Sequence, residues 1–78
     1  MVIVEVAYKS KEELDPQVDS IISVEASKAG GRWTGQGLAT KTKVRDMVFE
    51  FVRKRQASKF ASAMSKKGFS VEIREERY

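Results

Sequence analysis

The chain has 78 residues and a net charge of +4, from 15 basic and 11 acidic residues, and it contains neither cysteine nor histidine. A chain of this length forms one domain, residues 1–78. The missing residue types exclude disulfides, thiolate metal ligands and the most common general base, so we expect a protein that is not an enzyme and binds no cofactor or metal. No apolar run approaches the roughly 20 residues of a membrane span, and the lack of thiols favours a cytoplasmic location.

Two elements are predicted in the first part of the chain. Valines alternate with other residues over 2–9 and predict a strand. Pro16 is typical of a first helical position, and apolar residues three and four apart predict a helix over 16–28. The glycine at position 30 ends this helix. Its middle, Ile22-Ser23-Val24, would also suit a strand, which leaves this segment open at the level of the sequence.

The second predicted strand, residues 32–40, is irregular. Trp33 and Leu38 lie at positions of opposite parity, so a regular strand would point only one of them at the core. A β-bulge at residues 35–37, where two glycines occur, would add one residue and restore a common side. A bent, glycine-bearing strand fits the edge of a sheet.

The second half of the chain has clearer periodicity. Apolar and polar residues alternate over 44–52 and predict a third strand. Apolar residues at three-four spacing predict a second helix over 54–67, ended by Gly68. A last alternating segment begins at residue 69 and predicts the fourth strand.

The order strand, helix, strand, strand, helix, strand predicts a ferredoxin-like α+β sandwich, with an antiparallel sheet in the order 4-1-3-2. Both helices are then expected on one side of the sheet. The core expected from these patterns consists of Val2, Val4, Val6, Val18, Ile21, Ile22, Trp33, Leu38, Met47, Phe49, Phe51, Phe60, Ala61, Met64, Phe69, Val71 and Ile73.

Basic side chains gather at the two ends of the predicted sandwich. One end, around the hairpin between the second and third strands, holds Lys41, Lys43 and Arg45. The other end holds Arg32, Arg53, Lys54 and Arg55. Cations at the start of a helix are unfavourable, because that end of the helix dipole is positive. Sites that depart from such a preference are often functional, and several cations beside free N–H groups predict a site that binds an anion. The alternative is that these side chains are only solvated.

The sheet face away from the helices is predicted to be acidic. It is expected to carry Glu5, Asp46, Val48, Glu50 and Glu72, while Gln36 lies in the predicted edge strand. Four carboxylates repel phosphates, which excludes RNA binding through this face. A partly apolar, partly acidic face instead suits a basic protein surface or a second copy of the chain, unless it is simply solvated.

These patterns predict a small non-catalytic adaptor or inhibitor that docks onto a larger protein, or self-associates, through its sheet face or edge strand. The alternative function is a nucleic-acid-binding module that contacts phosphates through the basic loops and the start of the second helix. Fold alone selects neither function.

Overall fold

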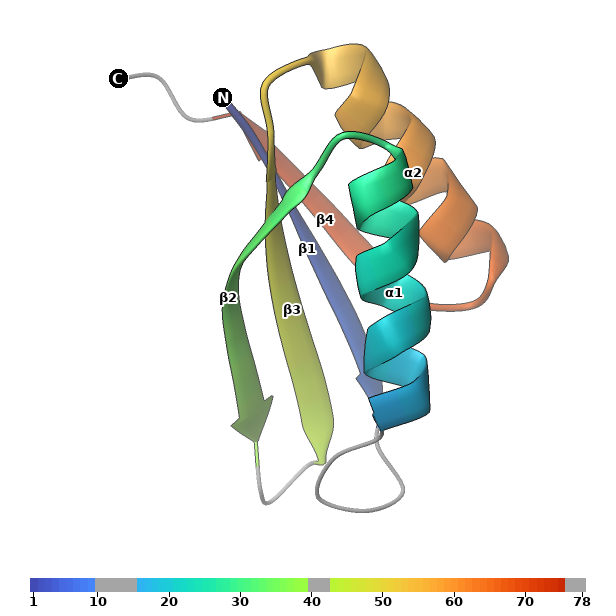
Figure 1. Cartoon of the computed structure of the whole chain (residues 1–78). Coiled ribbons are helices and arrows are strands. Elements are labelled where there is room, and N and C mark those ends of the chain that lie inside the picture. The colour runs from blue at the N-terminus through green and yellow to red at the C-terminus, as the bar shows by residue number, and fades with distance from the viewer. Residues whose placement is uncertain (10–15, 40–42, 76–78) are drawn as a thin grey trace.

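The computed structural model describes residues 1–9, 16–39 and 43–75. Its elements are β1 (Val2–Lys9), α1 (Pro16–Lys28), β2 (Arg32–Ala39), β3 (Val44–Phe51), α2 (Lys54–Lys66) and β4 (Ser70–Glu75). The four strands form one antiparallel sheet in the order β2-β3-β1-β4 (Figure 1). Read from the other edge this is the order 4-1-3-2, so the predicted ferredoxin-like α+β sandwich is confirmed. The segment Ile22-Ser23-Val24 is helical.

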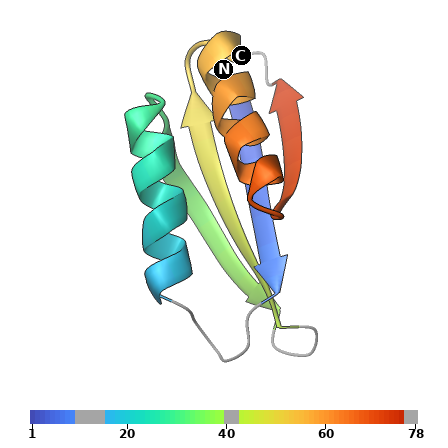
Figure 2. The same cartoon turned by 90° about the vertical axis from the view of Figure 1, so that its right-hand side faces the viewer.

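Both helices lie against the same side of the sheet, and the other side is uncovered (Figures 1 and 2). The strand periodicity explains this arrangement, because alternate residues of β1 and β3 are apolar and need a covering layer. The buried cluster joins these strands to four residues of α2 and two of α1: Val2, Val4, Val6, Met47, Phe49, Phe51, Ala57, Phe60, Ala61, Met64, Ile22 and Ala26. Phe60 lies at its centre, with its ring centroid 5.3 Å from that of Phe49 and 5.4 Å from that of Phe51.

Three residues predicted to belong to the core are exposed, and the prediction is wrong for them. Ile21 is 49% exposed because α1 turns Ile22, one residue along, toward the sheet. Trp33 and Ile73 face the helix side but remain 41% and 45% exposed. They lie on the two edge strands, each of which has a neighbouring strand on one side only. Val18, Phe69 and Val71 are partly buried against the core, and the side chain of Leu38 lies outside the described part.

The predicted bulge is present but lies at a different residue. The register of β2 against β3 shifts between Trp33 and Gly35, so Thr34 is the additional residue rather than a residue of 35–37. Trp33 is opposite Phe49 and Gln36 is opposite Met47. Residues of opposite parity therefore lie on the same side of the sheet, as the bulge was expected to allow.

Both helices end in a glycine with positive φ. Gly30 (φ 88°) follows α1 and Gly68 (φ 94°) follows α2. The residue after each glycine donates a backbone hydrogen bond to a carbonyl five positions earlier. Gly31 N–H donates to the Ala26 carbonyl at 2.7 Å, and Phe69 N–H donates to the Met64 carbonyl at 3.2 Å. These bonds satisfy carbonyls that a helix end leaves without partners, and they fix where the chain re-enters the sheet.

Candidate docking surface

The uncovered side of the sheet, called the open face from here on, is built by the register of the four strands. Its members alternate with the core residues along each strand: Ile3, Glu5, Ala7 and Lys9 of β1, Val44, Asp46, Val48 and Glu50 of β3, Ser70, Glu72 and Arg74 of β4, and Arg32, Gly35 and Gly37 of β2. The five open-face residues predicted as docking candidates, Glu5, Asp46, Val48, Glu50 and Glu72, are thus brought together on one surface.

Four carboxylates and three cations, Lys9, Arg32 and Arg74, share this open face. Glu5 and Glu72 are directly opposite each other on adjacent strands, a like-charge pair that costs stability. Arg74 lies within 3.6 Å of the Glu5 carboxylate and offsets part of this repulsion. Arg32 is opposite Glu50 at the same end of the sheet. The centre of the open face is therefore acidic, and its cations lie at its two ends, Arg32 and Arg74 at one and Lys9 at the other.

The floor beneath these charges is apolar and shallow. Ile3 is only 5% exposed although it lies on the open face, outside the helix-side cluster. Val48 is half-buried, and its neighbour on β2 is Gly35, where an added Cβ would lie 3.6 Å from the Val48 Cβ. Because Gly37 also lacks a side chain, no side chain covers the backbone of β2 at these two positions of the open face. Such a mixture of apolar floor and surrounding charge is typical of a recognition surface.

Gln36, the sixth docking candidate, lies apart from the others. The bulge at Thr34 places it on the helix side, where its Oε1 accepts a hydrogen bond from Arg45 Nη2 at 3.2 Å. The edge strand therefore offers its backbone rather than this side chain to a partner. One acceptor of that backbone, the Gly35 carbonyl, already receives a bond from Trp33 Nε1 at 2.9 Å.

A buried ion pair is the main polar feature that the sequence analysis missed. Arg45 is 5% exposed and lies on the helix side, so its assignment to the basic hairpin end is wrong. Its Nη2 lies 3.0 Å from Asp19 Oδ2, and its Nε donates to Asp19 Oδ1 at 3.4 Å. The Tyr8 hydroxyl donates to the same Oδ1 at 2.6 Å. The parity of Arg45, shared with Met47, was the available signal that this cation points inward.

The basic residues predicted as an anion site are brought only partly together. Arg53, Lys54 and Arg55 are exposed at the start of α2, whose first turn holds no acid and whose N-cap Arg53 makes no side-chain hydrogen bond. Lys54 pairs with Glu75 at 3.0 Å. Arg32 belongs to the same end of the sheet but to the open face, opposite Glu50.

The two lysines predicted at the hairpin, Lys41 and Lys43, do not add to the basic residues at the start of α2. Lys43 is exposed, with φ 57°, at the other end of the sheet. Lys41 lies outside the described residues. The predicted anion site therefore reduces to the three consecutive residues at the start of α2.

The comparisons with known proteins add no family. No protein-family model and no curated protein matches this chain. Within residues 1–9, 16–39 and 43–75, no three acidic side chains are grouped so as to hold a metal ion. Neither helix of the same segments is long and apolar enough to cross a membrane. Function is therefore argued from the surfaces.

Proposed function

We propose that the protein is a small non-catalytic adaptor or inhibitor whose open face docks onto a basic surface of a larger protein. The observation that carries this proposal is the acidic open face, where Glu5, Asp46 and Glu72 surround an apolar floor. The absence of cysteine from the chain supports a cytoplasmic setting for it.

The charge of the open face selects among the partners. A nucleic acid would bring phosphates against four carboxylates, which is unfavourable. A second copy stacked face to face would bring two acidic centres together, and unscreened like charges disfavour that contact. A partner surface rich in lysine and arginine complements the acidic charge of this face. A small apolar patch on the same partner complements its apolar floor by covering Val48.

The size of the open face sets the strength of the contact. Four strands about 4.8 Å apart and up to eight residues long cover roughly 500 Å². A stable complex buries about 800 Å² on each partner, so docking through this face alone corresponds to a transient complex. We therefore expect a dissociation constant on the order of 1–100 µM, which rises with ionic strength.

Photo-crosslinking tests the proposal without knowledge of the partner. Benzoylphenylalanine replaces Val48 on the open face or, as a matched control, the exposed Ser58 of α2, which lies on the other side of the molecule and on the same flank of the helix as Lys54. We expect a discrete heavier adduct from position 48 and no such adduct from position 58. The double substitution Asp46→Lys/Glu72→Lys removes the adduct because it reverses the charge of the face. An adduct that survives this reversal, has the mass of a homodimer, or arises equally from both positions would overturn the proposal.

A second candidate function rests on one observation, the start of α2. Arg53, Lys54 and Arg55 precede or open a helix with no acid in its first turn, and free N–H groups with several cations attract phosphates. The corresponding function is sequence-independent binding of a nucleic-acid backbone. A titration of duplex DNA between about 50 and 200 mM salt tests it, with Arg53→Gln/Arg55→Gln as the variant. Loss of affinity with salt and with this variant supports it, and no complex at micromolar protein and low salt contradicts it.

A further inference from the structure

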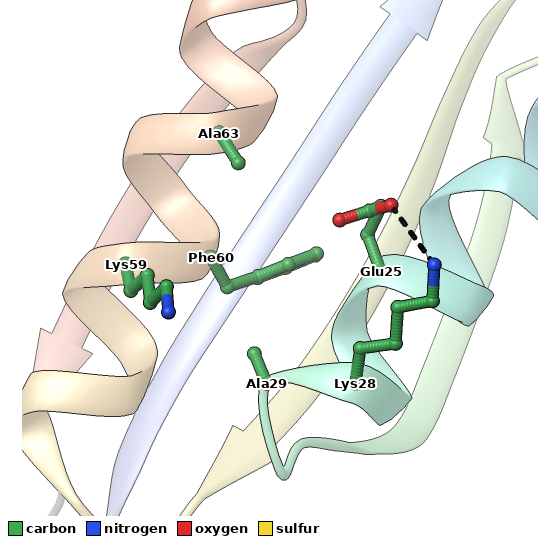
Figure 3. Close-up of a pocket in the computed structure, with 6 residues that line it drawn as sticks. All are labelled: Glu25, Lys28, Ala29, Lys59, Phe60 and Ala63. Carbon is green, nitrogen blue, oxygen red and sulfur yellow. Dashed lines mark ion pairs between the residues drawn. The ribbon is translucent and has the colours of Figure 1, made fainter.

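The side of the molecule opposite the open face has a hollow between its two helices. The hollow has a volume of about 270 Å³ and is called the interhelical groove from here on. It is lined by Glu25 and Lys28 of α1, by Ala29 directly after that helix, and by Lys59, Phe60 and Ala63 of α2. Figure 2 shows the two helices side by side on the sheet, and Figure 3 shows the six side chains between them.

The floor of the interhelical groove is apolar. Phe60 points from α2 toward α1, and Ala29 and Ala63 extend into the space from either side (Figure 3). Both alanines are only partly buried against the core. Because alanine is short, these positions leave room between the helices that a longer side chain would fill.

The α1 wall of the groove carries the ion pair of Glu25 and Lys28, with exposed apolar residues beside it. Ile21 is 49% exposed and Val24 is 47% exposed. Glu25 follows Ile21 by four positions, and Lys28 follows Val24 by four positions, so both apolar residues share a flank with residues that line the groove. Ile21 and Val24 therefore form a short exposed apolar strip beside the groove, which extends about 5 Å along the helix axis.

The α2 wall is basic. Arg55, Lys59 and Lys66 are exposed and follow one another at intervals of four and seven positions, so Arg55 and Lys66 continue the row of Lys59, which is the one of the three that lines the groove. No acidic residue occurs in α2. None of the three forms an ion pair with another described residue, in contrast to Lys54, which pairs with Glu75 on the far flank.

We propose that the interhelical groove binds an acidic amphipathic helix of a partner protein. An apolar floor and strip accept the partner's leucine-type side chains at three-four spacing, and the basic α2 wall pairs with its carboxylates. A second copy of this chain does not supply such a helix, because α2 has no acid and α1 has only two, Asp19 in its buried ion pair and Glu25 paired with Lys28. The groove thus takes a partner of opposite charge to the one proposed for the open face, and the two proposals stand independently.

A defined peptide tests this inference. The probe is a synthetic helix of about 14 residues, capped at both ends, with leucines at three-four spacing and glutamates elsewhere. The control peptide keeps the leucines and carries lysines in place of the glutamates. Binding is followed by NMR amide shifts of the isotopically labelled chain. We expect the glutamate peptide to bind with a dissociation constant on the order of 10–100 µM and to shift Ala29, Phe60 and Ala63.

Two charge-reversal variants separate the groove from general charge. Lys59→Glu/Lys66→Glu should raise the dissociation constant of the glutamate peptide at least about tenfold, which is about 1.4 kcal/mol of binding free energy. The matched control Lys43→Glu/Lys54→Glu makes the same change in net charge away from the groove. It should raise the dissociation constant of the glutamate peptide about threefold or less. Circular dichroism and amide spectra verify that both variants are folded. Equal loss in both variants, equal binding of the two peptides, no binding, or shifts confined to the open face would each overturn the inference.

Discussion

The substitution Asp19→Ala removes the carboxylate that faces the buried guanidinium of Arg45. In the folded protein Arg45 Nη2 lies 3.0 Å from Asp19 Oδ2, and the side chains of the two residues are 6% and 14% exposed. The Tyr8 hydroxyl donates to the same carboxylate at 2.6 Å. After the substitution the buried cation keeps only the neutral Gln36 Oε1 as a described partner.

The expected loss is large for a domain of this size. Removal of one partner of a buried ion pair costs about 3–5 kcal/mol, and the residual exposure of Asp19 favours the lower end, about 3 kcal/mol. A chain of 78 residues has a total stability of roughly 4–12 kcal/mol. At about 4–8 °C per kcal/mol, the melting temperature should fall by about 12–24 °C.

The assay is urea unfolding of the parent and of Asp19→Ala, followed by circular dichroism, with a control on the same helix. The control is Glu25→Ala, which breaks the exposed ion pair with Lys28 at 3.9 Å. An exposed pair of this kind contributes at most about 0.5 kcal/mol. If Asp19→Ala costs no more than Glu25→Ala, the attachment of α1 to the sheet through Arg45 is refuted.

An apolar replacement of the whole polar group tests the physical reason for the loss. The triple substitution Tyr8→Phe/Asp19→Leu/Arg45→Met leaves no buried charge and no hydroxyl directed at Asp19. Its stability should lie within about 1 kcal/mol of the parent, because the loss in Asp19→Ala arises from the uncompensated cation rather than from lost attraction. A triple variant as unstable as Asp19→Ala would instead assign the loss to packing.

The remaining predictions concern packing and helix ends, and all are measured by urea unfolding. Gly31→Ala should cost about 2 kcal/mol or more, because an added Cβ would overlap the Phe51 ring in the core; a loss below about 0.5 kcal/mol would contradict this packing. Gly68→Ala should cost about 1 kcal/mol through its φ of 94° alone, because nothing lies within 4 Å of an added Cβ, and Gly68→Asn should recover part of it. Ile22→Ala should cost about 2–4 kcal/mol and Ile21→Ala less than about 0.5 kcal/mol; the reverse order would mean that α1 is rotated about its axis.

The architecture was predictable where a strand and the helix packed against it both have a regular spacing of apolar residues. Alternation over β3 (Val44–Phe51) and three-four spacing over α2 (Lys54–Lys66) each identify one apolar side, and packing these sides together leaves little freedom. The open face follows from the same alternation. Its four carboxylates could therefore be assigned before any coordinates.

The rotation of α1 was not predictable in the same way. Ile21, Ile22 and Val24 are spread around the helix, so apolar spacing does not choose which of them faces the sheet. Tertiary contacts make the choice: Asp19 must reach Arg45, which is 26 positions away in the chain, and Ala26 must fit against the core. Long-range pairing of this kind leaves no mark in local spacing, and the exposed strip on α1 is its consequence.

The edge strands limited the prediction for a different reason. Trp33 and Ile73 have the correct parity for the helix side, but parity says nothing about how much of such a side chain stays exposed on a strand that has a neighbour on one side only. The bulge was inferred from the glycines, whereas the extra residue is Thr34, because a bulge needs space and backbone freedom nearby rather than glycine at the bulged position itself.

The most direct measurement of the charge separation between the two faces uses paramagnetic probes of opposite charge in NMR. Amide relaxation enhancement by a cationic and by an anionic nitroxide reports the local potential at each residue of the unmodified chain. We expect the cationic probe to be enriched at Glu5 and Val48 on the open face, and the anionic probe at Lys59 and Ala63 beside the interhelical groove. A ratio of the two enhancements that is equal on both sides of the sheet would contradict the account.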